Sequence, residues 1–311
     1  MVKALVIGAT GKQGGGTARA LLKAGHQVHA FTRNPDGEAA QALEAEGAVL
    51  FKGHTDDVDS IKAAAAGTSA VFWVSMPSFT DWDEEVRGTR NVIDAARQAG
   101  SVQHLIYSTT ATTDRVRQLP LWDHSPLMKR YWENKIAGEE AVRAAGFAHY
   151  TLLRPVEFMP NFLQPLASFQ YRDMLKTGVW RSAFPADFAI RYIDPEDIGR
   201  VAAAAIVDPE RFSGQAVEVA GDILPVGDSI KLLAAAAGKN LHIETLSWDE
   251  ALKLSEENPV LIGQLLRMQN AAIDQYSTRP LEDFGLGSFK KLKDYFEDHK
   301  AQVVETYKEV E

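Results

Sequence analysis

Tyr131 and Lys135 stand four residues apart in the segment Y-W-E-N-K, inside a stretch that is predicted to be helical. Residues at this spacing lie on one face of a helix. A tyrosine hydroxyl can exchange a proton with a carbonyl or an alcohol, and a nearby ammonium stabilises its phenolate form. The alternative is a helix with one buried tyrosine and one solvated lysine, because this spacing often arises by chance. The pair is a candidate for proton-transfer chemistry.

The segment Y-S-T-T-A supplies hydroxyl groups at the end of a predicted strand over 103–108. It holds Ser108, Thr109 and Thr110, and the predicted helix over 128–145 that bears the tyrosine comes next. A hydroxyl at this place would orient a carbonyl beside the tyrosine. The predicted catalytic residues are therefore Tyr131, Lys135, Thr109 and Thr110.

A glycine-rich turn follows the first apolar segment, V-K-A-L-V-I, and precedes a helical pattern. Gly8 permits the sharp turn, Gly11 lets the backbone approach a phosphate, and Gly14 lets the helix pack closely on the sheet. The free N–H groups of a helix N-terminus favour an anion. The context of strand, turn and helix predicts a dinucleotide site.

Arg33 and Asn34 end the second predicted strand, in the segment A-F-T-R-N, nineteen residues after Gly14. A carboxylate at this place would favour the ribose 2′-hydroxyl of NAD, whereas an arginine suits the 2′-phosphate of NADP. The alternative for Arg33 is a solvated strand end. The glycine turn upstream favours NADP(H), with Asn34 adding a neutral hydrogen bond.

Strand and helix patterns alternate through the first 155 residues. Several strands are continuous apolar runs, such as A-V-F-W-V, which are typical of parallel strands buried on both faces. The pattern predicts an α/β fold with a doubly wound parallel (Rossmann) sheet. The predicted strands are 3–8, 27–32, 48–52, 70–75, 103–108 and 149–154. The predicted helices are 14–24, 38–46, 57–66, 84–99 and 128–145.

The regular alternation ends after Arg154-Pro155. We predict loop and short helix over 156–190, and mainly helix from 225 to the end. The chain then divides into a dinucleotide-binding domain over 1–155 and a smaller, mostly helical lobe over 156–311 for substrate or partner. Some segments of the second part are expected to return to the main sheet.

Composition excludes several classes of protein. The chain has no cysteine, which rules out disulfides and thiolate chemistry and fits a cytoplasmic location. It has no apolar run long enough to span a membrane and no recognisable signal peptide. A net charge of −9 argues against direct binding to nucleic acid. The histidines lack metal-site spacing, so no metal is expected.

The chain resembles the NmrA-like family of atypical short-chain dehydrogenases/reductases. The resemblance covers nearly the whole chain, most densely residues 1–165. It rests on G-A-T-G-K-Q-G-G, T-R-N-P, G-A-V-L-F-K-G-H-T-D-D, the helix bearing Asn134-Lys135, and L-L-R-P-V-E-F-M-P-N-F-L. It implies cofactor contacts along the glycine turn, at the ends of strands two to four, and at two later segments. These contacts are Gly8, Ala9, Thr10, Gly11, Lys12, Gln13, Arg33, His54, Thr55, Ser75, Met76, Pro77, Lys135, Phe158, Met159, Pro160 and Asn161.

The chain departs from this family pattern at two positions. His54 stands where relatives usually carry an acid, and Tyr131 stands where non-catalytic sensor members carry histidine.

Two functions follow from these residues. The first is an NADPH-dependent reductase of a small carbonyl or activated double bond, which Tyr131 favours. The second is a non-catalytic NADP(H) redox sensor that regulates a partner protein such as a transcription factor. The resemblance, and the lack of a substrate-specific motif over 156–190, favour the second. The enzyme is the preferred hypothesis. The sequence does not identify the substrate.

Overall fold

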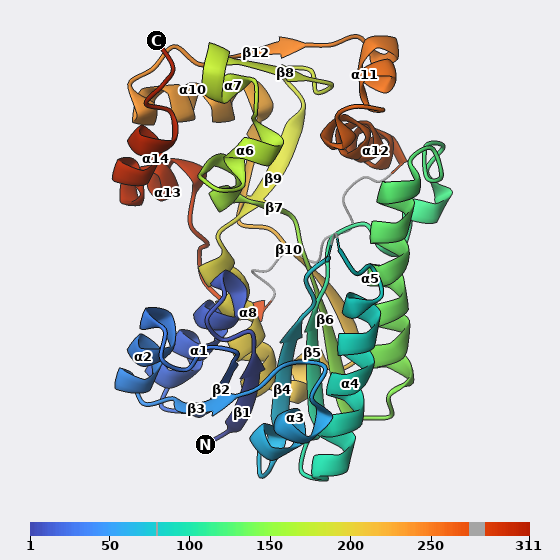
Figure 1. Ribbon diagram of the computed structural model, residues 1–311, viewed down its shortest axis with the longest axis vertical. Coiled ribbons are helices and arrows are strands. Elements are labelled where there is room, and N and C mark those ends of the chain that lie inside the picture. The colour runs from blue at the N-terminus through green and yellow to red at the C-terminus, as the bar shows by residue number, and fades with distance from the viewer. Residues whose placement is uncertain (79, 274–283) are drawn as a thin grey trace.

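A parallel sheet forms the base of the protein in the computed structural model, which describes residues 1–78, 80–273 and 284–311 (Figure 1). Within these ranges the sheet has seven strands in the order β10-β6-β5-β4-β1-β2-β3. The strands are β1 (Lys3–Ile7), β2 (Gln27–Thr32), β3 (Val49–Lys52), β4 (Ala70–Val74), β5 (His104–Ser108), β6 (His149–Pro155) and β10 (Gln215–Val219). All six pairings are parallel, as predicted for a doubly wound sheet.

Helices cover both faces of this sheet. One face carries α1 (Lys12–Lys23), α2 (Glu38–Ala45) and α8 (Pro195–Val207), and the other carries α3 (Val58–Ala65), α4 (Glu84–Ala99) and α5 (Pro126–Ala144). Alternate residues of each central strand enter opposite cores. In β4, for example, Phe72 joins the first core and Val71 the second. This burial on both faces explains why the central strands are continuous apolar runs in the sequence.

Side-chain caps set where several helices begin. Asp57 accepts a hydrogen bond from the backbone N–H of Ser60 at 3.1 Å, and Asp194 accepts one from Glu196 at 3.1 Å. Ser125 caps α5 in the same way, with Pro126 as the first helical residue. These caps satisfy N–H groups that have no partner inside the helix. Because Ser125 and Pro126 together start the helix, α5 begins two residues before the predicted position.

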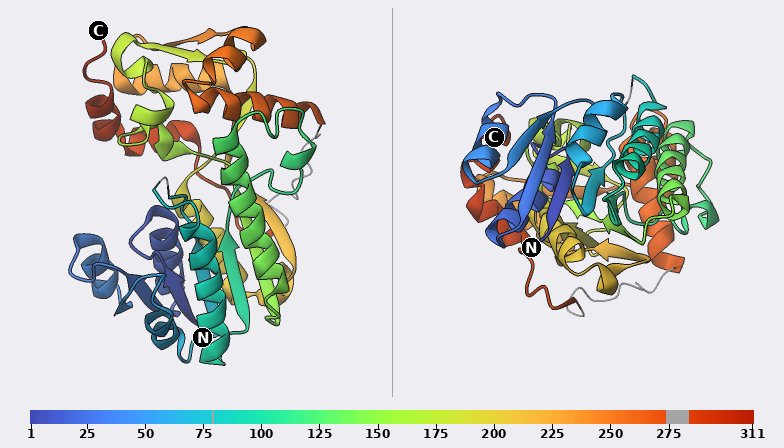
Figure 2. Two further views of the ribbon diagram at one scale, coloured as in Figure 1. Left: turned by 45° about the vertical axis from the view of Figure 1, so that its right-hand side comes forward. Right: turned by 90° about the horizontal axis from the view of Figure 1, so that it is seen from below.

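The second lobe lies beyond the carboxyl ends of the strands (Figure 2). It contains a three-stranded sheet, β11-β9-β7, and a two-stranded sheet, β12-β8, among the described residues. Its strands are β7 (Glu157–Phe158), β8 (Val179–Ser182), β9 (Ala189–Ile193), β11 (Asp222–Pro225) and β12 (His242–Thr245). Its helices are α6 (Ala167–Gln170), α7 (Met174–Thr177), α10 (Val226–Ala237), α11 (Trp248–Leu254), α12 (Pro259–Ile273), α13 (Leu292–Asp298) and α14 (Lys300–Thr306).

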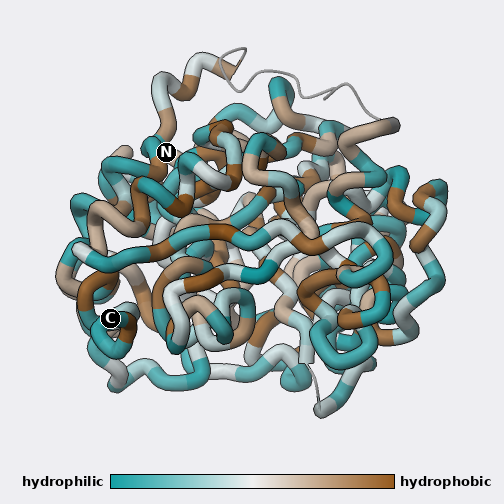
Figure 3. Tube along the Cα trace, turned by 90° about the horizontal axis from the view of Figure 1, so that it is seen from above, coloured by the Kyte–Doolittle hydropathy of each residue, from teal (hydrophilic) through white to brown (hydrophobic). Residues whose placement is uncertain are grey.

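The lobe has an aromatic core of its own. Phe162 lies at its centre, with its ring stacked on Tyr171 at 4.8 Å and edge-on to Phe296 at 5.3 Å. Viewed from the lobe side, hydrophobic and hydrophilic stretches alternate along the chain (Figure 3). This alternation is expected for elements that bury one face.

The lobe differs from the prediction in two places. The segment 156–190, predicted as loop and short helix, also contains β7, β8, the start of β9 and a 3-10 turn over Met159–Phe162. The end of the chain, which lies in the part predicted to be mainly helix, forms two short helices that meet at His299. Short strands of two or four residues leave too little periodicity in a sequence to be recognised.

Part of the chain after residue 156 completes the main sheet. β10 pairs in parallel with β6, and α8 packs against α1. The backbones of α1 and α8 touch where Gly16 meets Gly199. A Cβ on Gly199 would lie 2.2 Å from the carbonyl carbon of Gly16. This glycine contact fixes α1, and with it the turn that follows β1.

We expect Gly199→Ala to destabilise the fold by about 1–3 kcal/mol, because the added methyl group forces the two helix backbones apart. Gly263→Ala in α12 is the matched control. Its Cβ would meet only Met128 Cε at 3.9 Å, so it should gain about 0.5–1 kcal/mol from better helix propensity. Urea denaturation of the three proteins measures both effects. Equal stability of Gly199→Ala and the parent protein would contradict the packing described here.

Candidate functional site

The turn between β1 and α1 has the backbone that the glycine motif predicts. Gly8 adopts a left-handed conformation with φ of +76°, and the Gly11 N–H donates to the Gly8 carbonyl at 2.9 Å. Gly11 is the N-cap of α1, so the helix begins at Lys12 rather than at residue 14. The first turn of α1 holds no acidic side chain. Its N-terminus therefore remains suitable for an anion.

The turn fits the pyrophosphate of a dinucleotide. A Cβ on Gly14 would lie 2.2 Å from the Gly8 oxygen, which shows how closely the helix approaches the strand. Thr10, Gly11 and Lys12 are exposed, whereas Ala9 and Gln13 are buried. The Ser108 hydroxyl donates to Gln13 Oε1 at 2.6 Å, which fastens the turn to the end of β5. The exposed backbone at Gly11, which carries no side chain, is thus held in a fixed position.

The ends of β2 and β3 lie beside this turn. Arg33 is exposed, and its side chain makes no hydrogen bond or ion pair with the described part of the chain. The Thr32 hydroxyl accepts from the Asn34 N–H at 3.2 Å and lies 3.4 Å from Thr10 Oγ1. His54 Nδ1 accepts from the Asp56 N–H at 3.2 Å. The Thr55 carbonyl accepts from the Asn91 amide at 2.8 Å.

Lys135 lies in a buried network at the end of β4. Its ammonium donates to the Ser75 carbonyl at 2.9 Å and to Ser75 Oγ at 3.3 Å, and it pairs with Glu85 Oε1 at 2.5 Å. Ser75 Oγ donates to the same Glu85 oxygen at 2.6 Å and lies 2.8 Å from the Tyr107 hydroxyl. Burial opposes the charged form of Lys135, but the Glu85 carboxylate together with the nearby Tyr131 and Tyr107 outweighs burial, so the pKa of the ammonium is raised.

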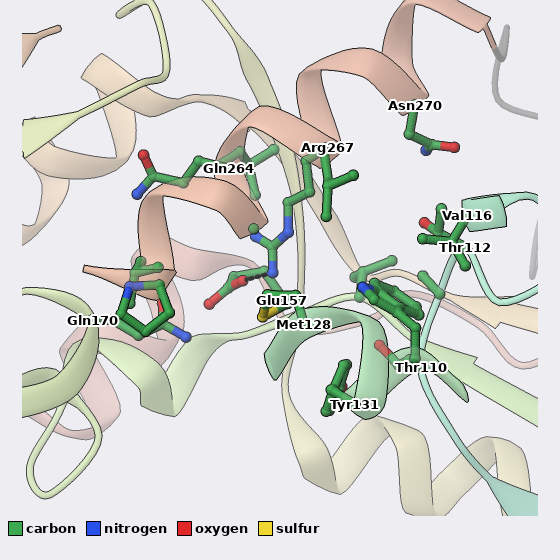
Figure 4. A pocket seen from close by; sticks show the side chains of 18 of the residues that line it. Thr110, Thr112, Val116, Met128, Tyr131, Glu157, Gln170, Gln264, Arg267 and Asn270 are labelled. Atoms are coloured by element: carbon green, nitrogen blue, oxygen red, sulfur yellow. Dashed lines mark ion pairs between the residues drawn. The ribbon is translucent and has the colours of Figure 1, made fainter. Parts of the chain in front are cut away.

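Tyr131 lies one turn before Lys135 and faces a different environment. The Lys135 ammonium is 5.7 Å from the centre of the Tyr131 ring, so the two are close without a hydrogen bond. The ring is half-buried and lies edge-on to Trp132 at 5.4 Å. Figure 4 shows its side chain among those that line a pocket. The helix therefore brings both predicted residues to one place but gives them different partners.

The two predicted threonines have separate roles. Thr109 is buried, and its hydroxyl donates to Glu139 Oε1 at 2.8 Å. The Thr113 hydroxyl donates to the same oxygen at 2.7 Å. Arg154 holds the same carboxylate through Nε at 3.0 Å and Nη2 at 2.7 Å. Burial disfavours the charged form of Glu139, but the hydrogen bonds from Arg154 and the threonines outweigh it and lower the pKa of this carboxyl group. Thr110 instead lines the pocket.

The remaining predicted contacts are spread around this edge. Ser75 is buried, Met76 is 70 % exposed, and Pro77 lines the pocket. Phe158 packs on the core of the main sheet, while Met159 and Pro160 are buried. Asn161 donates to Glu157 Oε1 at 2.6 Å.

The pocket lies between the two lobes and encloses about 340 Å³. Its lower side is formed by residues that follow β4 and β5 and by Tyr131 from α5. Its upper side is formed by α12 and by aromatic residues of the second lobe. These aromatic residues are Phe169, Tyr171, Trp180, Phe184 and Phe188. Ligands of doubly wound proteins bind outside the carboxyl ends of the strands, which is where this pocket lies.

The sheet order, the glycine turn and the pocket at the carboxyl edge define a doubly wound α/β protein of the Rossmann type. The chain belongs to the NmrA-like family, whose model matches residues 2–300. A relative from Aspergillus sp. (strain MF297-2), the NmrA-like family domain-containing oxidoreductase notA, is 31 % identical over 270 residues. That match covers 78 % of this chain and 76 % of the relative.

Two solved structures share the fold. One is the NADPH-dependent quinone oxidoreductase QOR2 of Escherichia coli, complexed with NADPH, with a TM-score of 0.72 and 24 % identity. The match covers 95 % of this chain and 99 % of QOR2. The other is NmrA, a negative transcriptional regulator, in complex with NAD, with a TM-score of 0.73 and 20 % identity. It covers 95 % of this chain and 94 % of NmrA.

Two further observations concern the described ranges alone. Within them, no three His, Cys, Asp or Glu side chains gather in a way that could hold a metal ion. No helix there is long and apolar enough to cross a membrane.

The polar residues that surround the predicted site residues could not be recognised from the sequence. Glu85 and Tyr107 hold the network around Lys135, and Glu139 takes the hydroxyl of Thr109. Arg267 of α12 forms an ion pair with Glu157 in the pocket. An isolated acid or arginine on a helix is usually solvated, so the sequence carried no signal for these contacts.

We expect Gly11→Ala to weaken NADPH binding about 100-fold or more, about 2.7 kcal/mol, because a side chain there blocks the approach of a phosphate. Its Cβ would meet only the Gly8 oxygen at 3.2 Å, so the fold should remain intact. Gly14→Ala is the comparison, because its Cβ would clash with Gly8 and should lower the melting temperature. Fluorescence titration with NADPH and thermal denaturation separate the two effects. Unchanged affinity in Gly11→Ala would show that the turn is not the phosphate site.

Proposed function

We propose that this protein binds NADP(H) along the carboxyl edge of its sheet and reduces a small carbonyl compound or activated double bond in the adjacent pocket. One observation carries the proposal. Tyr131, a side chain able to donate a proton, lines an aromatic pocket next to the strand ends that carry the predicted cofactor contacts.

The cofactor would lie across β1, β2 and β4. The pyrophosphate would rest on the N–H groups of the glycine turn, at the N-terminus of α1. Arg33 and Asn34 would hold the adenosine 2′-phosphate, with Thr10, His54 and Thr55 beside them. Ser75, Met76 and Pro77 would pass under the nicotinamide half. The likeness to QOR2, which is complexed with NADPH, supports this assignment.

The reduced nicotinamide supplies a hydride to the substrate when it is bound. Tyr131 would donate the matching proton to the substrate oxygen, so that a carbonyl gains one hydride and one proton and becomes an alcohol. Thr110, which lines the same pocket, would orient that oxygen by a hydrogen bond. Thr109 would not contact the substrate directly, because its hydroxyl already donates to Glu139.

Lys135 would serve as a positioning residue in this scheme. Its ammonium holds the backbone carbonyl of Ser75, which sets the path of the chain into Met76 and Pro77. Its charge lies 5.7 Å from the Tyr131 ring and is shared with Glu85. It would therefore assist the tyrosine through its electric field rather than by a direct hydrogen bond.

One observation favours the sensor function as a second candidate. The three N–H groups of Lys135 are directed to Ser75 and Glu85, so no direct hydrogen bond activates Tyr131. In that function NADP(H) occupancy would change the affinity for a partner protein such as a transcription factor, without turnover. The structural likeness to NmrA, a negative transcriptional regulator, agrees with it.

We expect NADP(H) to bind at least tenfold more tightly than NAD(H), about 1.4 kcal/mol, because Arg33 offers a guanidinium to the 2′-phosphate. Arg33→Glu should abolish the preference. Arg97→Glu is the matched control, because it makes the same charge change at the C-terminal end of α4, at the opposite edge of the sheet. Calorimetric titrations with both cofactors provide the test, and equal affinities in the parent protein would refute NADP selectivity.

We expect Tyr131→Phe to lower turnover about 100-fold or more, as loss of a positioned proton donor does, while NADPH affinity stays nearly constant. Tyr150→Phe removes a hydroxyl at the amino end of β6 and should leave turnover unchanged. The assay follows NADPH absorbance with a panel of carbonyl compounds. Turnover that survives Tyr131→Phe would defeat the proposed mechanism. Absence of turnover with every compound, combined with tight NADPH binding, would favour the sensor.

A further inference from the structure

The pocket presents one face of α12 to its interior. Gln264, Arg267 and Asn270 follow one another at intervals of three residues, so they line the same side of the helix. Figure 4 shows all three among the side chains around the pocket, above Tyr131 and Thr110. The rest of the upper side is largely aromatic and aliphatic, apart from Gln170 and Arg191.

Arg267 keeps hydrogen-bonding capacity that the described residues do not use. Its Nη2 pairs with Glu157 Oε2 at 2.5 Å, and a guanidinium has five N–H groups. The side chain is 48 % exposed, and Figure 4 shows its guanidinium directed into the pocket. Glu157 is buried and fixes the arginine in place. It offers little to a ligand, because its other oxygen accepts from Asn161 at 2.6 Å.

The two amides on this face are anchored through their oxygens. Gln264 Oε1 accepts from Ser182 Oγ at 2.9 Å and from the Ala183 N–H at 2.7 Å. Asn270 Oδ1 accepts from Arg115 Nε at 2.7 Å. A backbone N–H or a guanidinium can only donate, so these contacts determine which amide atom is the oxygen. The NH₂ group of each amide keeps no partner among the described residues.

The pocket is thus rich in donors and poor in charged acceptors. Among the described residues that line it, Glu157 is the only carboxylate, and both its oxygens are engaged. A ligand that complements the pocket must bring oxygen acceptors to Arg267. A carboxylate does this best, because guanidinium and carboxylate form two parallel charge-assisted hydrogen bonds. The aromatic side chains around it favour a flat ring system.

We propose that the pocket selects aromatic compounds that carry a carboxylate, with Arg267 as the residue that recognises the anion. Gln264 and Asn270 supply further N–H groups to the oxygen atoms of the ligand. Binding the carboxylate at α12 leaves the opposite side of the ring toward Tyr131 and Thr110. The carboxylate preference stands on pocket chemistry alone, and only the view that the bound compound is reduced rests on the proposed function.

Calorimetry with three probes of one shape tests this inference: 2-naphthoate, neutral 2-naphthamide and cationic 2-naphthylmethylammonium. We expect 2-naphthoate to bind about tenfold or more tightly than either analogue, the size of one charge-assisted hydrogen bond. Arg267→Gln should remove this preference. That change leaves Glu157 buried without its partner. The double variant Arg267→Gln/Glu157→Gln is therefore measured as well, and it should also lose the preference for 2-naphthoate. Arg181→Gln, which breaks an exposed ion pair with Glu244 in the same lobe, is the matched control.

Equal binding of the three probes, or a carboxylate preference that survives in both Arg267 variants, would overturn the inference. The outcome is separable from catalysis, because binding is measured without turnover. A protein that binds 2-naphthoate selectively but consumes no NADPH would contradict the reductase and support the pocket assignment. A reductase that prefers neutral aryl ketones to their carboxylated counterparts in kcat/KM would contradict the pocket assignment alone.

Discussion

The buried ion pair between Lys135 and Glu85 determines how the two halves of the site meet. It joins α5 to α4, and through Ser75 it joins both helices to the end of β4. Removing one partner of such a pair leaves an uncompensated buried charge, which costs several kcal/mol. The pair therefore fixes the register of α5 against the sheet. Tyr131, one turn earlier on the same helix, comes to its place in the pocket as a consequence.

The same pair limits the chemistry that is available to Tyr131. An ammonium whose N–H groups are engaged elsewhere acts on the tyrosine by its field alone, and Glu85 reduces that field. In the proposed reductase, a site with this arrangement would rely more on orientation than on a strongly activated acid. The reductase and the sensor proposed above therefore differ in whether the Tyr131 hydroxyl donates a proton.

Local patterns were enough to predict most of the main sheet. The apolar runs and the glycine turn each act within a few residues, so the sequence indicated strands β1 to β6 and their helices within about two residues. The return of β10 to the sheet and the contact of Gly16 with Gly199 join segments that are far apart in the chain. Some later segment was expected to return to the sheet, but no local pattern encodes which strand it pairs with or which glycines meet. The short strands of the second lobe are stabilised by packing against other elements, and they are too short to show a periodic pattern in the sequence.

The site was predictable in part for the same reason. Residues at strand ends, such as Arg33 and Ser75, follow from the geometry of a parallel sheet, because all carboxyl ends meet at one edge. The partners that determine the chemistry of the site residues do not follow from this geometry. Glu85 approaches Lys135 from another helix, and Glu139 takes the hydroxyl of Thr109 through the fold. Arg267 belongs to a helix whose position only the tertiary structure reveals.

The most direct test of this account is a crystal structure of the protein with NADPH bound. The account predicts the pyrophosphate on the glycine turn and the adenosine 2′-phosphate at Arg33. It also predicts that C4 of the nicotinamide faces the pocket, so that a substrate atom beside Tyr131 would lie within about 3–3.5 Å of it. A nicotinamide ring that is directed away from the pocket, with Tyr131 out of reach of any bound substrate, would contradict it.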